Sequence, residues 1–139
     1  MTQSKSERIL AAIAATLAPT AGIASRVFRD RWEAVARNEM PCLVIEPQGE
    51  DPQIVAIPYT DSTLTLNVDI LVSGSPLSTL ADPTRVDAHA RLMADRSLGG
   101  LALNLEAGPV AWSAEPGEIG ILSLTYRVTY RTLTTDLTQ

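Results

Sequence analysis

The chain has 139 residues, a length that one hydrophobic core commonly organises, so we expect a single α+β domain over residues 1–139. Eleven basic against sixteen acidic residues leave a net charge of −5, which repels phosphate backbones and argues against nonspecific nucleic-acid binding. The start of the chain lacks a secretory signal pattern, and no stretch has the roughly 18 apolar residues of a membrane span, so we expect a soluble intracellular product.

Two features of the composition bear on partners. Cys42 is the only cysteine, so no disulfide forms within the chain, which suits a reducing compartment. Arginine outnumbers lysine ten to one, and arginine is enriched at protein interfaces because its planar fork makes bidentate contacts. A GC-rich coding sequence explains the same bias, so both interpretations stay open.

The N-terminal segment predicts a helix over residues 5–17. Ser4-Lys-Ser-Glu7 has the form of a capping box, in which a serine side chain and a glutamate satisfy free backbone donors at a helix start. Apolar residues then recur at helical spacing, and a proline and a glycine soon after them favour a stop. The expected apolar stripe is Ile9, Leu10, Ile13 and Leu17.

Residues 23–61 are predicted to contain an edge strand, a buried strand and an irregular projection. Charges within residues 23–32 indicate an edge strand that deters unwanted pairing. Met40 to Glu46 is a short apolar run typical of a buried strand. The polar segment from Pro47 to Pro52 is typical of a turn, so we expect a mobile projection, extended to Asp61, that becomes ordered when a partner docks.

A central strand and a second helix are predicted next. Residues 63–73 alternate strictly, with five aliphatic side chains on one face, which indicates a central antiparallel strand. Asp82-Pro83 supplies a cap and a first-turn proline, so we expect a helix over residues 83–96 with Val86, Ala90 and Met93 as its apolar stripe.

The last third predicts further strands. Alternating leucines at 101–105, a short strand at 110–114 and a turn at 115–118 lead into a half-buried strand over residues 119–132. The order of elements gives an α+β fold, a mainly antiparallel sheet with two helices packed on one face.

Motifs that carry chemistry are missing from the sequence. The chain has no Walker loop, no Gly-x-Gly-x-x-Gly and no Gly-x-Ser-x-Gly motif. Its one histidine, His89, is expected half-buried or exposed on the second helix. We therefore expect no enzyme, no cofactor and no metal site. An α+β ligand-binding domain or enzyme that uses His89, Tyr126 or Tyr130 stays open as an alternative.

The order of several short motifs resembles a known family. The motifs are Leu64-Thr-Leu-Asn-Val-Asp-Ile-Leu-Val72, Met93-Ala-Asp95, Leu98-Gly-Gly-Leu101 and Tyr126-Arg-Val-Thr-Tyr130-Arg-Thr132. From the first helix to about Asp136 the chain resembles the tail terminator proteins of long-tailed bacteriophages, including those called minor tail protein U. Neck or head-tail completion proteins and tail tube subunits share this size and topology, so they stay open as alternatives.

The resemblance implies a virion structural protein, made in the host cytoplasm, that forms a homo-hexameric ring on the head-proximal end of the tail. The implied partners are other copies of the chain, the tail tube protein and a head-completion or neck protein, and DNA would pass through the lumen without specific binding. No membrane contact is implied. We expect subunit or tube contacts from charged and polar residues of the edge strand, the projection and the last strand: Arg26, Arg29, Arg31, Gln48, Glu50, Asp51, Arg127 and Arg131.

Overall fold

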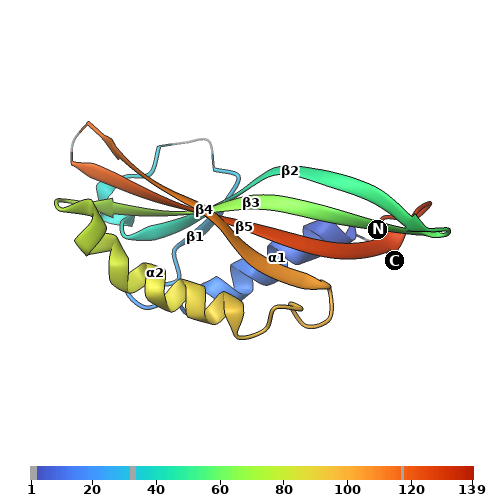
Figure 1. The fold of residues 1–139 in the computed structure, drawn as a ribbon. Helices are drawn as coiled ribbons and strands as arrows, with labels where there is room; N and C mark the ends of the chain where they lie inside the picture. The colour runs from blue at the N-terminus through green and yellow to red at the C-terminus, as the bar shows by residue number, and fades with distance from the viewer. Residues whose placement is uncertain (1–2, 32–33, 117) are drawn as a thin grey trace.

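The computed structural model describes residues 3–31, 34–116 and 118–139. Its elements in chain order are α1 (Lys5–Leu17), β1 (Val27–Arg29), a short 3-10 helix η1 (Arg37–Glu39), β2 (Cys42–Ala56), β3 (Tyr59–Ser73), α2 (Leu77–Met93), β4 (Asn104–Glu115) and β5 (Ile119–Leu133). The strands lie in the order β1-β2-β3-β5-β4; β1 pairs with β2 in parallel, and the other pairings are antiparallel. Figure 1 shows α1 and α2 on the same side of the sheet, which confirms the predicted α+β fold.

Helix α1 has the predicted bounds and the predicted buried stripe. Its N-cap residue is Ser4, whose hydroxyl accepts a hydrogen bond from the backbone N–H of Glu7 at 3.2 Å. The second half of the capping box is replaced by an ion pair, because the Glu7 carboxylate contacts Arg29 of β1 at 2.9 Å. The cap therefore starts the helix, and the ion pair joins its first turn to the edge of the sheet.

The core lies between the two helices and the apolar face of the central strands. Alternate side chains of β3 and β5 face the helices, as the sequence pattern predicts, and α1 and α2 contribute one stripe each. The largest fully buried side chains include Tyr126, Ile13, Leu17, Leu66 and Ile70. The other face of the sheet carries the polar residues and is the surface that the helices leave open.

Helix α2 differs from its predicted bounds and stripe. It begins at Leu77, so Asp82 is not its cap, and Pro83 lies inside the helix. Pro83 is exposed, so water can reach the carbonyl that loses its donor there. The predicted stripe is wrong for Val86 and Ala90, which are exposed, whereas Met93 packs half-buried against the core. The fully buried residues of the helix are Ala81, Thr84, Ala88 and Leu92. Two alanines on this face let the helix pack closely on the sheet.

The segment predicted as an irregular projection is a paired strand. β2 continues to Ala56 and pairs with β3 along its whole length, with irregularities between Pro47 and Gly49 and between Ile54 and Ala56. β1 pairs only with Leu43 to Ile45, so beyond that point the outer side of β2 is a free edge, where a proline costs no ladder hydrogen bond. The segment does project, as the long β2–β3 hairpin at the right of Figure 1.

The remaining strands follow the prediction in part. The edge strand expected within residues 23–32 is confirmed as β1. The two strands expected between residues 101 and 114 are one strand, β4, with an irregularity between Ala107 and Val110. β5 extends the predicted final strand by one residue, to Leu133.

Both ends of the chain lie beside the hairpin. The backbone N–H of Lys5 donates to the carbonyl of Leu137 at 2.8 Å, and its Nζ donates to the carbonyl of Arg131 at 2.9 Å. The N–H of Thr134 donates to the carbonyl of Pro58, close to the hairpin turn, at 2.7 Å. Figure 1 shows the two termini together at that end of the sheet.

Candidate assembly surfaces

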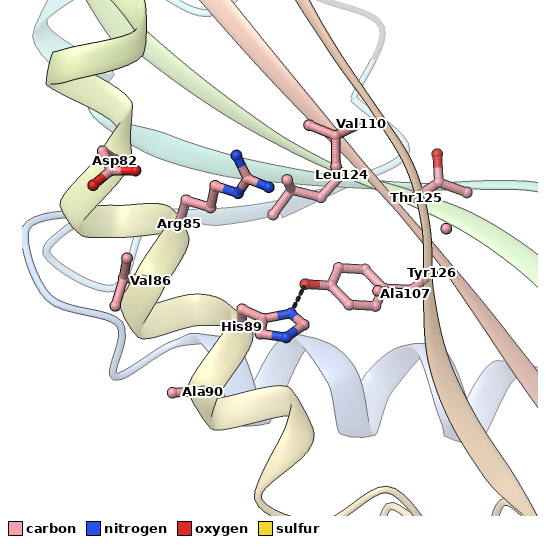
Figure 2. Close-up of a pocket in the computed structure, with 11 residues that line it drawn as sticks. Asp82, Arg85, Val86, His89, Ala90, Ala107, Val110, Leu124, Thr125 and Tyr126 are labelled. Carbon is pink, nitrogen blue, oxygen red and sulfur yellow. Dashed lines mark hydrogen bonds between the residues drawn. The ribbon is translucent and has the colours of Figure 1, made fainter.

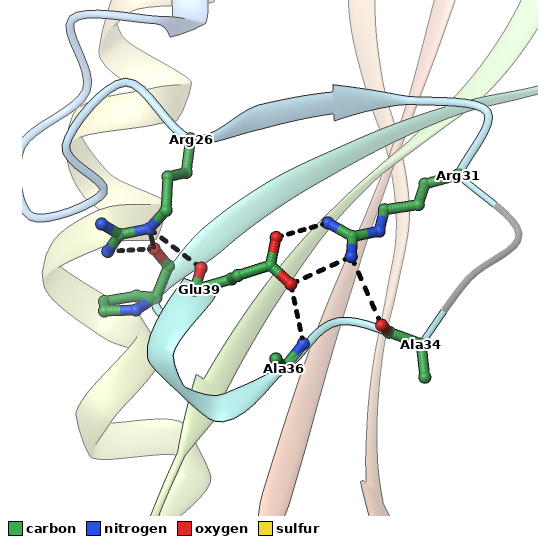
Figure 3. Close-up of polar contacts among 6 residues, drawn as sticks. Arg26, Arg31, Ala34, Ala36 and Glu39 are labelled. Carbon is green, nitrogen blue, oxygen red and sulfur yellow. Dashed lines mark hydrogen bonds and ion pairs between the residues drawn. The ribbon is translucent and has the colours of Figure 1, made fainter.

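Three of the arginines predicted as interface residues bind groups of their own subunit. Arg31 forms a fork on the carboxylate of Glu39, with distances of 2.7 and 2.9 Å (Figure 3). Arg26 donates to the backbone carbonyls of Glu39 and Pro41, and Arg29 pairs with Glu7. These side chains hold residues 34–41 close to β1. Ala34, Val35 and Met40 line a cavity with Val44 and Asp69 at one end of the open face. Cys42 is fully buried, and burial raises the pKa of its thiol to about 11.

The acid partners of these arginines are held ionised. The hydrogen bond from Arg31 is the main cause that lowers the pKa of Glu39 to about 2, and the hydrogen bond from Arg29 lowers the pKa of Glu7. The folded-state pKa values of both carboxyls are depressed. The two carboxylates therefore stabilise the fold above their unfolded-state pKa, and this stabilisation is lost as pH falls through the folded-state pKa.

Four other predicted residues line one cavity at the open face, although the Glu50 carboxylate reaches Tyr130 on the helix-facing side. Gln48, Glu50, Asp51 and Arg127 line a shallow cavity of about 500 Å³, together with Gly49, Thr63 and Thr65. Among the described residues Arg127 has no ion-pair partner, whereas the hydroxyl of Tyr130 donates to Glu50 at 2.7 Å. Burial is the main cause that raises the pKa of Tyr130 to about 12.

Arg131 lies on the same face but has a partner. Its guanidinium contacts the carboxylate of Asp61 on the neighbouring strand at 2.7 and 3.1 Å, and it lies over the ring of Tyr59 at 5.6 Å. The hydrogen bond from Arg131 lowers the pKa of Asp61. Of the two arginines on the last strand, Arg127 is therefore the one whose charge is available to another molecule.

A polar ladder crosses the middle of the open face. The Ser123 hydroxyl donates to Asp69 at 2.6 Å, and the Thr125 hydroxyl donates to Asn67 at 3.2 Å. Burial raises the pKa of Asp69 despite the hydrogen bond from Ser123. The ionised form of Asp69 is thus disfavoured in the folded chain.

We expect Asp69→Asn to raise the melting temperature at pH 7. The folded-state pKa of Asp69 is raised, so its stabilising contribution is present below the unfolded pKa, near 3.8, and is lost as pH rises through the folded pKa. Asparagine keeps an acceptor for Ser123 without the charge, and the difference from wild type should vanish in acid. The matched control is Asp61→Asn, which should lower the melting temperature at pH 7 because the pKa of Asp61 is depressed by Arg131. Equal shifts in both variants would contradict this account.

A groove separates α2 from β4 and β5 (Figure 2). We name it the α2–β4 groove. It has a volume of about 520 Å³, and its lining is mostly apolar: Asp82, Arg85, Val86, His89, Ala90, Ala107, Gly108, Val110, Leu124, Thr125 and Tyr126. His89 is exposed, as predicted, and its Nδ1 lies 2.9 Å from the hydroxyl of Tyr126. Burial is the main cause that raises the pKa of Tyr126 to about 12, so the phenol stays neutral.

Exposed apolar side chains gather in two places. Val86 and Trp112, 62% and 53% exposed, lie on the elements that form the α2–β4 groove, and Arg85 lies over the Trp112 ring at 5.7 Å. The second group is the end of the β2–β3 hairpin, where Ile57 is 92% exposed. We name this group, Ile54, Val55, Ile57 and Tyr59, the hairpin tip. Contiguous exposed apolar surface commonly marks an interaction site.

Sequence reasoning missed both groups of exposed apolar side chains, although His89 and Tyr126 of the groove were named for the alternative of a ligand-binding domain or enzyme. The apolar run Ile54-Val-Ala-Ile57 was a visible signal, but its place in a polar, proline-bounded segment favoured a loop. The groove joins α2 to two strands that begin 11 and 26 residues after its end (104 − 93 and 119 − 93), so no local pattern could predict its lining.

Some other kinds of site are not found in the described ranges 3–31, 34–116 and 118–139. No group of three or more histidine, cysteine or acidic side chains there is placed to hold a metal ion. The helices of the same ranges are all too short or too polar to cross a membrane.

The fold is similar to that of chains in solved structures. The structure superposes on a chain of the solved structure described as "Virion of native gene transfer agent (GTA) particle", with a TM-score of 0.52 and 12% sequence identity. The match covers 88% of this chain and 93% of that chain. The two chains share a fold. No protein-family model matches the sequence, and no curated protein matches it.

Proposed function

We propose that this protein is a structural component of a phage-like virion, and within that class a tail terminator. In this role it forms a ring, hexameric in the family that the sequence resembles, on the head-proximal end of the tail tube. It stops tube growth and presents the surface that joins the tail to the head. The observation that carries the proposal is the fold match to a virion chain over nearly the whole of both chains.

The surfaces described above support an assembly role without catalysis. Gln48, Asp51 and Arg127 are predicted for subunit or tube contact and make no ion pair among the described residues, and they line one cavity together with Glu50. We propose this cavity as a contact with the tail tube protein or a neighbouring subunit. A net charge of −5 suits a ring through which DNA slides, because cationic contacts to phosphate make DNA binding tight.

The deciding experiment is negative-stain electron microscopy with native mass spectrometry, at low and high protein concentration, with and without isolated tail tubes. Rings, or density that caps one end of a tube, are expected. Binding to isolated capsids instead of tubes would favour a neck or head-tail completion protein. A monomer that ignores both would overturn the virion role, and a ligand-induced rise in melting temperature would then indicate a ligand-binding domain.

Arg127→Glu is expected to weaken ring formation or tube capping while leaving folding intact. The side chain is half-buried, lines the open-face cavity and has no ion pair among the described residues, so its loss should change stability by only about 0.5 kcal/mol. The measurement is the fraction of capped tubes, with melting temperature recorded in parallel. Arg127→Lys keeps the charge and serves as the control. An Arg127→Glu chain that caps tubes as wild type does would remove this residue from the interface.

A further inference from the structure

We propose that the hairpin tip of one subunit docks in the α2–β4 groove of a second copy of this chain. The inference rests on the proposed ring, for which it supplies the subunit contact. Both surfaces are apolar and exposed in the single chain: the tip carries Ile57, 92% exposed, and the groove is flanked by Val86, 62% exposed.

The tip cannot fill the groove of its own chain. Leu66 of β3 pairs with Tyr126, which lines the groove, and Ile57 precedes Leu66 by nine residues (66 − 57). At about 3.3 Å per residue in a strand, the tip lies about 30 Å from the level of the groove. Figure 1 shows the hairpin extending away from α2. A contact between the two surfaces therefore requires two copies.

The groove has the size and lining for an apolar insertion. Its volume of about 520 Å³ is in the range that admits several side chains, and Leu124, Val110 and Ala107 form its strand side. Ala90 and Val86 line it from α2, and Figure 2 shows Arg85 and His89 pointing from that helix towards the strands. Of the polar lining groups, the Tyr126 hydroxyl already has a partner in His89, so an apolar occupant leaves it satisfied.

Charge does not oppose the same pairing. The hairpin segment 46–61 has four carboxylates and no lysine or arginine. At the groove, Arg85 makes no ion pair among the described residues. Asp82 also lines the groove, and its charge offsets that of Arg85. Asp61 is already paired with Arg131, so three carboxylates of the hairpin segment remain, and they meet no net charge at the groove.

The contact joins two different surfaces, so its symmetry is head-to-tail. Each copy has one tip and one groove, and a heterologous contact of this kind generates a closed ring when the rotation per subunit closes. It leaves the open-face cavity free for a different partner.

Cross-linking tests the contact directly. Ile57→Cys and Ala90→Cys replace one exposed tip residue and one exposed groove residue, and the native Cys42 is buried and unreactive. An equimolar mixture of the two single variants, treated with a short bis-maleimide, should give a cross-linked dimer that neither variant gives alone. The double variant should give a ladder that ends at the ring size. In the control, Ser78→Cys replaces Ala90→Cys on the same helix, twelve residues away (90 − 78), about 18 Å along its axis.

A charge variant gives an independent readout. Ile57→Asp should weaken self-association at least ~10-fold in native mass spectrometry with an unchanged melting temperature, because the residue is exposed in the single chain. Ile57→Leu should assemble as wild type.

The results of these experiments distinguish a failure of the tip-to-groove contact from a failure of the proposed terminator role. Rings that form without the tip-to-groove cross-link, or with equal cross-linking at Ser78→Cys, would overturn the inference and leave the terminator role standing. Cross-linking of Ile57→Cys to the tail tube protein, and not to Ala90→Cys, would reassign the tip to the tube and also overturn it. A specific tip-to-groove ladder in a protein that caps no tubes would support the contact and count against the terminator role.

Discussion

Leu66→Ala is expected to lower the free energy of unfolding by about 2–5 kcal/mol, the usual range for truncating a buried leucine. Leu66 is fully buried on β3, and its strand lies between β2 and β5 in the sheet. Its register partners are Pro47 and Tyr126, so truncation leaves a void among the central strands beneath the two helices. Chemical denaturation monitored by circular dichroism gives the change.

The control for Leu66→Ala is the adjacent Thr65→Ala. Thr65 has the opposite orientation on the same strand and lies on the open face, so its truncation should cost less than ~1 kcal/mol. Similar losses in the two variants would mean that the helices do not cover the face that carries Leu66.

Gly120→Val is expected to destabilise the chain by about 1–3 kcal/mol, or more if α2 moves, because it overpacks a closed contact. A Cβ at Gly120 would lie 3.0 Å from Cβ of Leu77 and closer still to its Cδ1. Leu77 is the first residue of α2, so the substitution pushes the start of that helix away from β5. Thermal melting measures the loss. Displacement of α2 should also change the α2–β4 groove, and hence ring formation in any chain that still folds.

Gly49→Val is the matched control in another strand. A Cβ at Gly49 meets no atom within 4 Å, and a β-branched residue suits a strand better than glycine, so this variant should be neutral or slightly stabilising. Equal destabilisation by both substitutions would contradict a packing origin for the effect at Gly120.

The sequence predicts the helices and strands that bury one face and expose the other. β3 and β5 are recognisable because every second side chain faces the helices, and α1 because a cap and a narrow stripe coincide. β2 is missed beyond Glu46, where prolines and acidic residues favour a turn, because its backbone hydrogen bonds come from β3 and no local pattern shows that pairing. α2 is misplaced because Asp82-Pro83 is a strong local start signal, and a proline on its exposed side is tolerated inside a helix.

The candidate surface residues also divide into those that the sequence predicts correctly and those whose role depends on tertiary pairing. Gln48, Glu50, Asp51 and Arg127 were expected from charge and position, and the fold places them around one cavity. The predicted arginines of the edge strand are instead held by Glu7 and Glu39, acids that lie before and after that strand in the chain. Such ion pairs depend on which elements the fold brings together and not on the residue types. Composition alone could therefore not separate the arginines that pair within the chain from the residues that line the open-face cavity.

The contact of Lys5 with Leu137 and Arg131 makes the two chain ends neighbours at the hairpin end of the molecule. A gold-binding or fluorescent label fused to either end would therefore report from the same place, next to the tip and far from α2. On a capped tube, the position of such a label along the tube axis would reveal the polarity of the subunit, with no substitution in either contact surface.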